Sequence, residues 1–375
     1  MRRCSILAAV VFAASSSSLP LEAHPPHSPH PDREAVEARR PSGAGIAPRE
    51  HGTSGQGALR FRVLLTSEEL PERAREVLAS AHGGFAVDRR PGRGEVYFAL
   101  PGAGLLQISA DLQSVHLLDT DPVMRDVNLH NTTLWEAADG TPLLSLPAND
   151  EGRVFTTTLS GRLVHTLEAP GGGSDLGRPE VNAYFREGGR FTPTDVDHLQ
   201  GLLYVTTGYS DLDWVLTAGV HGTSPLAIDW HDLAFGGRGT GPGQLGTGHG
   251  VTVVRGDPVR VDVADRPHAE IDRFAPDGTY LSTLELPEGS FPCDIDYLDG
   301  HAVVGALHGP DREKGAPVYV LQGDRVVSEV RPKEELGLEG FQHIHNAVLR
   351  RIDGRFYIIM QAWNPGDFAI LEQVD

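Results

Sequence analysis

Cysteine is nearly absent from this chain of 375 residues, which contains only Cys4 and Cys293. So few cysteines exclude the disulfide frameworks of small secreted domains, and stability must therefore come from packing or from a bound metal. Methionine and phenylalanine are also scarce, at 3 and 13 residues, which argues against a pliable helical core. No apolar run is long enough to span a membrane.

Positive charge is scarce as well. The chain has 32 lysine and arginine residues against 51 aspartate and glutamate residues, so its formal net charge is −19. Such a charge opposes binding to nucleic acid or to an anionic membrane surface through the overall field of the protein.

Glycine and proline are abundant, at 44 and 27 residues, and this favours many turns and short strands over long helices. The length is enough for one large single-core fold or for two modest domains. We therefore expect an all-β fold.

The N-terminus has the features of a secretory signal peptide. Arg2 and Arg3 precede an apolar run from Ser5 to Ala14, and the small-residue site Leu21-Glu22-Ala23 follows. Residues 1–23 are thus predicted to be a signal peptide, and the protein to be secreted or periplasmic. Cleavage would remove Cys4 and leave Cys293 as a lone thiol.

Residues 24–58 are rich in proline, glycine, serine and charge, the composition of a disordered linker. His24, His27 and His30 in this segment could bind a transition metal weakly, although a solvated tail is the better interpretation. Residues 59–84 are predicted to be a lead-in segment with a short helix from Pro71 to His82, before Gly83 and Gly84.

From residue 85 to residue 375 the chain repeats a unit of short apolar strands joined by turns. The first strands of five units can be aligned, and successive starts differ by 64, 55, 44 and 52 residues. With an earlier unit at residues 85–118 this makes about six units, which predicts a six-bladed β-propeller. The aligned strands begin with Leu129–Thr132, Pro193–Val196, Gly248–Val251, Pro292–Ile295 and Ile344–Ala347.

One unit closely resembles an NHL repeat. Its matching segments are Phe235–Leu245, His249–Val251, Val263–Arg266 and Phe274–Gly278. The glycine-rich segment supplies turns that need positive φ, and Ala264-Asp265-Arg266 has the pattern of a second strand and its exit.

Histidine recurs at one position of the aligned strands, in alternate units: His130, His249 and His345. Because the innermost strands of a propeller line its central channel, these side chains should converge on the axis. Three neutral imidazoles form a His₃ zinc site with a fourth position open for water or substrate. The alternative is three channel histidines bonded to water or backbone.

Cys293 shares this position in its unit, either as a nucleophile or, in the interpretation we prefer, as a small buried residue. His198 and His343 fall off the register and are expected at the surface or beside the site. Asp195, Asp265 and Asp294 are expected to accept hydrogen bonds from backbone amides.

The alternating histidines resemble those of the peptidyl-α-hydroxyglycine α-amidating lyases, which cleave a peptidyl-hydroxyglycine into a peptide amide and glyoxylate. The resemblance extends to Thr207-Gly208-Tyr209, to Gly241–Gln244 and to Ala264-Asp265-Arg266. It implies a bound zinc, a catalytic tyrosine at Tyr209 and a charge-stabilising arginine at Arg266. A packing role for Tyr209, and an ion pair between Arg266 and Asp265, are the structural alternatives.

This sequence departs from the lyase pattern at two places. The family has an essential arginine in the first unit, but Val96–Pro101 offers none in register, and Arg89, Arg90 or Arg93 would need a different geometry. The calcium-binding aspartate of the family corresponds to Asn346, which keeps a coordinating oxygen but lacks the charge.

We therefore predict a secreted, zinc-dependent lyase that acts on a small molecule or peptide, with calcium as a structural ion and a monomeric state favoured. A metal-dependent, lactonase-like hydrolase is one alternative. The other is a non-catalytic propeller that binds a protein or small ligand through its loop face.

Overall fold

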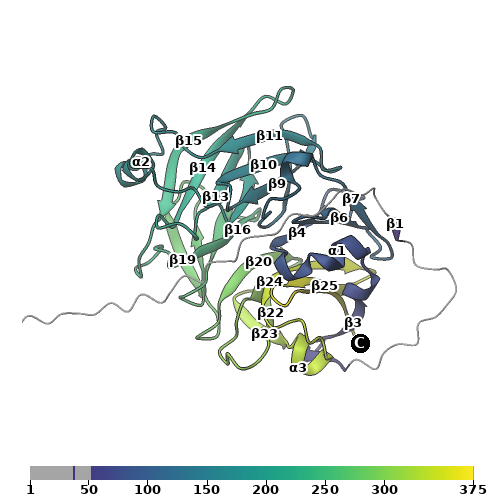
Figure 1. Ribbon diagram of the computed structural model, residues 1–375. Helices are drawn as coiled ribbons and strands as arrows, with labels where there is room; N and C mark the ends of the chain where they lie inside the picture. Colours follow the sequence, from purple (N-terminus) through teal and green to yellow (C-terminus); the bar gives the residue numbers. More distant parts are fainter. Residues whose placement is uncertain (1–36, 39–51, 375) are drawn as a thin grey trace, which may run out of the picture. The chain divides into compact units, whose positions relative to one another are not determined.

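The structure, a computed structural model, describes residues 37–38 and 52–374. The predicted signal peptide and most of the predicted linker lie outside these residues. Six antiparallel sheets are arranged as a six-bladed β-propeller, which confirms the predicted all-β fold (Figure 1). Innermost strands of neighbouring blades contact one another from β4 through β8, β12, β16, β20 and β24 back to β4, so the ring is closed.

The first three blades are antiparallel meanders numbered in chain order from the channel outward. The first contains β4 (Gly83–Val87), β5 (Val96–Leu100), β6 (Gly104–Ile108) and β7 (Val115–Leu118), and β1 (Glu37–Ala38) pairs with β7. The second contains β8 (Thr133–Glu136), β9 (Pro142–Ala148), β10 (Arg153–Thr158) and β11 (Leu163–Glu168). The third contains β12 (Asp195–Leu199), β13 (Leu202–Thr206), β14 (Trp214–His221) and β15 (Ala227–Gly236).

The remaining blades follow the same plan, except that the last one takes strands from both ends of the described chain. The fourth contains β16 (Gly248–Val254), β17 (Arg260–Asp265), β18 (Glu270–Phe274) and β19 (Tyr280–Glu285). The fifth contains β20 (Pro292–Leu298), β21 (His301–Ala306), β22 (Val318–Gln322) and β23 (Arg325–Val330). The sixth contains β24 (Ile344–Ile352), β25 (Arg355–Ala362), β26 (Asp367–Gln373), β3 (Leu59–Thr66) and β2 (Ser54–Gln56).

The sixth blade is closed by β3, which pairs antiparallel with β26. The lead-in segment therefore supplies an outer strand of the ring, and residues 54–56 at the end of the predicted linker form β2 beside it. This pairing was not foreseen, because its partners are separated by about three hundred residues and leave no local pattern.

The described helices are short. They are α1 (Glu72–Glu76), α2 (Pro179–Arg186), α3 (Pro332–Leu336) and the 3₁₀ turns η1 (Ser67–Glu69), η2 (Leu78–Ser80) and η3 (Pro122–Met124). The helix predicted from Pro71 to His82 is thus shorter than expected, because His82 is held in a bridge with His130 and cannot be helical. No helix in the described part of the chain is long and apolar enough to cross a membrane.

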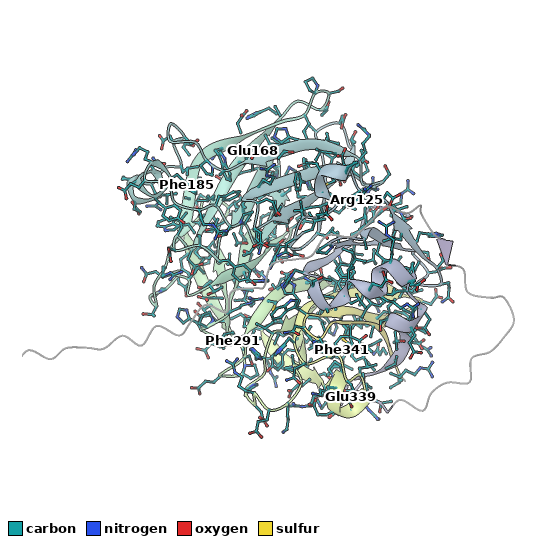
Figure 2. All side chains as sticks on the ribbon, viewed as in Figure 1. Arg125, Glu168, Phe185, Phe291, Glu339 and Phe341 are labelled. Carbon is teal, nitrogen blue, oxygen red and sulfur yellow. The ribbon has the colours of Figure 1, made fainter. Side chains whose placement is uncertain are left out.

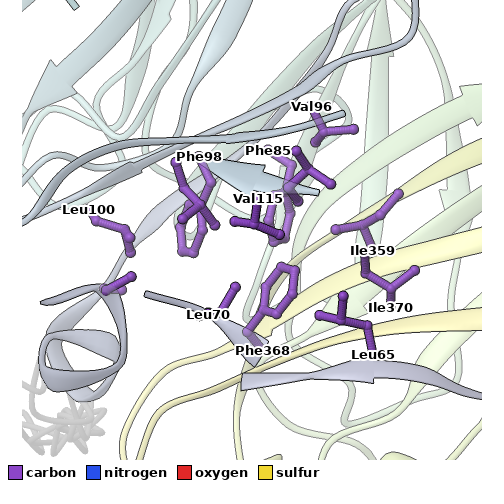
Figure 3. Packing of buried hydrophobic residues seen from close by; sticks show 14 of the residues in the cluster. Leu65, Leu70, Phe85, Val96, Phe98, Leu100, Val115, Ile359, Phe368 and Ile370 are labelled. Atoms are coloured by element: carbon purple, nitrogen blue, oxygen red, sulfur yellow. The ribbon is translucent and has the colours of Figure 1, made fainter. Parts of the chain in front are cut away.

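Apolar side chains fill the spaces between blades. One cluster joins the lead-in segment, the first blade and the sixth blade, and Figure 3 shows Phe85 packed between Phe98 and Phe368. The ring centroids of these pairs are 4.7 and 6.0 Å apart. A second cluster contains Phe61 of β3 and Phe341, which is labelled in Figure 2, and both are fully buried.

Aspartate side chains also join neighbouring blades at the channel. Asp195 and Asp197 of β12 accept hydrogen bonds from the backbone N–H groups of Val251 and Val253 in the next blade, at 2.8 and 2.6 Å. Asp296 of β20 accepts one from the N–H of Leu349 at 2.7 Å. These bonds fix the height of β16 relative to β12 and of β24 relative to β20.

We expect the closing strand to contribute strongly to stability. Phe61→Ala should lower the free energy of unfolding by about 3–5 kcal/mol, because it opens a cavity in a fully buried cluster. Denaturant unfolding measures the loss, and Val123→Ala, at a side chain 48% exposed, is the control. Equal stability of the two variants would contradict this role of β3.

Candidate functional site

Three of the predicted site residues meet at one end of the channel. His249 lies in β16 and His345 in β24, and His130 lies three residues before β8. One ligand nitrogen from each ring lies within 4.8 Å of the other two, and the Nε2 atoms of His130 and His249 are 3.3 Å apart. We call these three residues the histidine cluster. All three are buried, at 0–3% exposure.

Backbone carbonyls orient two of these rings. Nδ1 of His130 donates to the carbonyl of Thr194 at 2.5 Å, and Nδ1 of His249 donates to the carbonyl of Cys293 at 2.7 Å. Each acceptor belongs to the blade that follows in the ring. With Nδ1 carrying the proton, Nε2 of each ring has a lone pair directed at the cluster, as a metal ligand requires.

His345 is the third member, and neither of its buried ring nitrogens has a hydrogen-bond partner among the described residues. Burial lowers the pKa of His345 and of His249 well below the usual value, and neighbouring positive charge lowers it further. The two rings are therefore neutral at physiological pH. A neutral imidazole with an unsatisfied buried nitrogen fits a transition-metal ligand.

Tyr209 and Arg266 lie beside the histidine cluster. A guanidinium nitrogen of Arg266 donates to the Tyr209 hydroxyl at 2.7 Å, and that hydroxyl lies 3.1 Å from Nε2 of His249. Arg266 therefore does not form the alternative ion pair with Asp265, whose carboxylate instead accepts from the N–H groups of Gly246 and Thr247.

The pKa of the Tyr209 phenol is raised, although a positive charge lies beside the hydroxyl. Burial raises the pKa of the phenol above its usual value, and the nearby Arg266 charge opposes this without overcoming it. The guanidinium of Arg266 is itself kept charged, because the Cys293 thiol and the Tyr209 phenol offset its burial and raise its pKa. Arg266 alone does not make Tyr209 a phenolate.

Cys293 contacts the terminal guanidinium nitrogen of Arg266 that does not bond Tyr209. It is fully buried, and its Sγ accepts from the second terminal guanidinium nitrogen at 3.1 Å. Burial raises the pKa of the thiol, whereas a cysteine nucleophile needs a lowered one. This environment favours the interpretation of Cys293 as a small buried residue.

A fourth histidine, His82, completes the wall of the site and was missed in the sequence. Its ring stacks on that of His130 at 5.5 Å and meets that of His345 edge-on at 5.1 Å. Nδ1 of His82 lies 3.1 Å from Oδ1 of Asn128. Extending the strand alignment to Ala81-His82-Gly83 would have placed a histidine at the same register in the first unit.

The two histidines off the register lie outside the histidine cluster, but His343 lies beside the site, since Trp363 contacts both His343 and His82 at 6.1 and 5.3 Å. His343 packs against His308 at 4.6 Å, and His308 in turn lies 5.9 Å from Phe291, which is labelled in Figure 2. His198 packs against Trp135 at 4.6 Å in the wall of a cavity at the other end of the channel.

That cavity has a volume of about 1180 Å³, and none of the three clustered histidines lines it. Arg89 and Arg90 do line it, paired with Asp296 and Asp88 at 2.6 and 2.7 Å. Neither arginine therefore substitutes at the histidine cluster for the missing first-unit arginine of the lyase pattern. This cavity is thus separate from the candidate metal site.

Between the two ends lies a polar layer. Asn346 donates from Nδ2 to Asp294 at 2.9 Å, and its Oδ1 accepts from the N–H of Phe85 at 3.1 Å. Burial raises the pKa of Asp195 well above its usual value and that of Asp294 to about 7, and the Asp294 charge adds to the shift of Asp195. Both carboxylates also accept backbone N–H bonds, as expected from the sequence.

Comparison with known proteins identifies neither a family nor an activity for this chain. No family model matches the sequence, and no curated protein matches it. Similar solved structures include a streptogramin B lyase, with 12% identity over 86% of this chain and 98% of that chain and a TM-score of 0.46. Another is a virginiamycin B lyase from Staphylococcus aureus, with 12% identity over 78% and 96% of the two chains and a TM-score of 0.44. A chain of the mitotic checkpoint complex is also similar, with 12% identity over 92% of this chain and 99% of that chain and a TM-score of 0.45. Proteins with unrelated roles are thus equally similar to this chain, and the similarities do not indicate an activity.

Proposed function

We propose that the histidine cluster binds zinc and that the protein is a metal-dependent lyase whose reaction resembles that of the amidating lyases. The observation that carries the proposal is the convergence of three buried imidazoles, two of which have Nε2 directed at the cluster by carbonyl acceptors. Three nitrogen ligands leave a fourth position for substrate or water, the arrangement of catalytic zinc sites.

A bound zinc ion supplies a Lewis acid that polarises a substrate hydroxyl and lowers its pKa. In this proposal His130, His249 and His345 hold the ion and keep it close to the Tyr209 hydroxyl, which lies 3.1 Å from His249. Because burial keeps Tyr209 protonated without the ion, the charge of a bound ion together with that of Arg266 would be needed to favour its phenolate, which would then accept the hydroxyl proton. Arg266, charged and bonded to Tyr209, stabilises the negative charge that develops.

The chemistry balances without an oxidant. The hydroxyl group on the α-carbon of a peptidyl-α-hydroxyglycine loses its proton, and its oxygen becomes the carbonyl oxygen of glyoxylate. At the same time the bond between this α-carbon and the peptide nitrogen breaks. The nitrogen leaves with the electron pair of that bond and takes up a proton, which gives the peptide amide. Tyr209 is placed to shuttle this proton.

Further features of the proposal rest on the sequence. Residues 1–23 support export from the cytosol. A structural calcium ion is proposed at Asn346, whose Oδ1 accepts one hydrogen bond among the described residues and could supply one of the about six to eight oxygen ligands that calcium needs. A small molecule or peptide is the proposed substrate, and a monomer the proposed state.

Metal content tests the first part of the proposal. Purified protein should contain about one zinc per chain at this site, and His249→Ala should lose it, because a ligand is removed. His221→Ala, at an exposed histidine, is the matched control and should keep the metal. Chelation should lower the free energy of unfolding by about 4 kcal/mol if zinc was present at roughly 1,000 times its Kd.

Folded protein that takes up no metal at the cluster would overturn the zinc proposal. That result would favour the alternative of a non-catalytic binding propeller.

Turnover tests the second part. Incubation of zinc-loaded protein with a peptidyl-α-hydroxyglycine should release glyoxylate, and Tyr209→Phe should lower kcat by about 10²–10⁴-fold with metal content unchanged. Tyr184→Phe, at a partly exposed tyrosine on α2, is the control for loss of a hydroxyl. Release by wild type no faster than by His249→Ala would reject this reaction and leave the lactonase-like hydrolase to be assayed.

A further inference from the structure

A second group of metal-ligating side chains lies in the fourth blade, on the turn between β17 and β18. We call residues 265–270 the blade-four turn. Asp265 ends β17 and Glu270 begins β18, and the two are paired across the hairpin, so their side chains share one face of the sheet. His268 lies in the turn between them.

The three side chains converge. Nδ1 of His268 lies 2.7 Å from Oδ2 of Asp265 and 3.8 Å from Oε1 of Glu270, and ligand atoms of all three residues lie within 4.8 Å of one another. His268 and Glu270 are each 25% exposed at the side chain, whereas Asp265 is fully buried. The group is therefore buried at Asp265 and open to solvent at His268 and Glu270.

A separate observation points to a cation here. Asp272 lies two residues beyond Glu270 on the same face of β18 and is 1% exposed. Its Oδ1 accepts from the hydroxyl of Thr283 at 2.6 Å, but its buried Oδ2 has no partner among the described residues. Residues two apart on a strand lie on the same face, so Asp272 is the neighbour of Glu270 on that face of β18.

Crowding of carboxylates supports the same conclusion. Asp265 and Glu270 are paired across the hairpin and Asp272 follows on the same face of β18, so three carboxylates lie near one another on one surface of the blade. A divalent cation between these groups would relieve both the burial of charge and the repulsion.

We propose that Asp265, His268 and Glu270 form a second divalent-metal site, with Asp272 as a neighbouring buried carboxylate on the same face of β18. One imidazole with two or three carboxylates suits Mn²⁺ or Zn²⁺. The ion would take the place of the proton that lies between Nδ1 of His268 and the Asp265 carboxylate. On binding, that proton would move to Nε2 of His268 or be released to solvent.

The proposed site adjoins Arg266, which bonds Tyr209 beside the histidine cluster. Arg266 follows Asp265 directly, and its carbonyl accepts from the N–H of Ala269 inside the same turn. A metal that ties Asp265 to His268 and Glu270 would hold the turn that presents Arg266 to Tyr209. The inference does not depend on zinc binding at the histidine cluster.

The test uses Mn²⁺ alone, titrated into metal-free full-length protein and followed by the electron paramagnetic resonance signal of the free ion. In the His249→Ala background, which removes the histidine cluster as a site, one Mn²⁺ should still bind per chain. Adding His268→Gln and Glu270→Gln should weaken this binding by at least about tenfold, a lower limit for loss of ligands. The control pair is His231→Gln with Asp232→Asn, an exposed histidine and aspartate 3.5 Å apart, and it should bind like its parent.

The wild-type background covers the case in which His249→Ala does not fold. There the His268 and Glu270 substitutions should remove about one bound Mn²⁺ per chain and leave the remaining sites unchanged. Mn²⁺ binding that is the same with and without these two substitutions would overturn the proposal. Loss of Mn²⁺ binding only with His249→Ala would support the histidine cluster and reject the blade-four site.

Discussion

Hydrogen bonds between an inner strand and the next blade are the interaction on which the channel depends. Asp195, Asp197 and Asp296 each accept from a backbone N–H group in the following blade. Asp195 and Asp197 are buried, which makes their bonds costly to lose, and the bonds of all three hold β16 against β12 and β24 against β20. The histidine cluster uses the same device, because His130 and His249 donate to carbonyls of the blade that follows.

Much of the channel could be predicted because equivalent positions of the inner strands recur along the sequence. His130, His249 and His345 occupy equivalent positions of inner strands, and a closed ring brings equivalent positions together at the axis. His82 occupies the same register but was overlooked, since the segment before it was interpreted as helix. The actual helix ends at Glu76, and pairing with His130 makes the backbone at His82 extended.

Features that depend on long-range packing could not be predicted. The pairing of β3 with β26 joins buried residues of two strands about three hundred residues apart, so no local pattern predicts it. The resemblance to the lyases implied Tyr209 and Arg266 as site residues, but their hydrogen bond depends on a loop of the third blade meeting a turn of the fourth. The rise in the pKa of Tyr209 follows from that enclosure, which residue types do not indicate.

The pairing of β3 with β26 also sets an order of events during synthesis. Residues 59–66 leave the ribosome early, but their partner strand ends at Gln373. Until then β3 lacks its main neighbour and the ring remains open. An unpaired strand edge invites association with other chains, so the nascent protein is exposed to aggregation for nearly the whole of its translation.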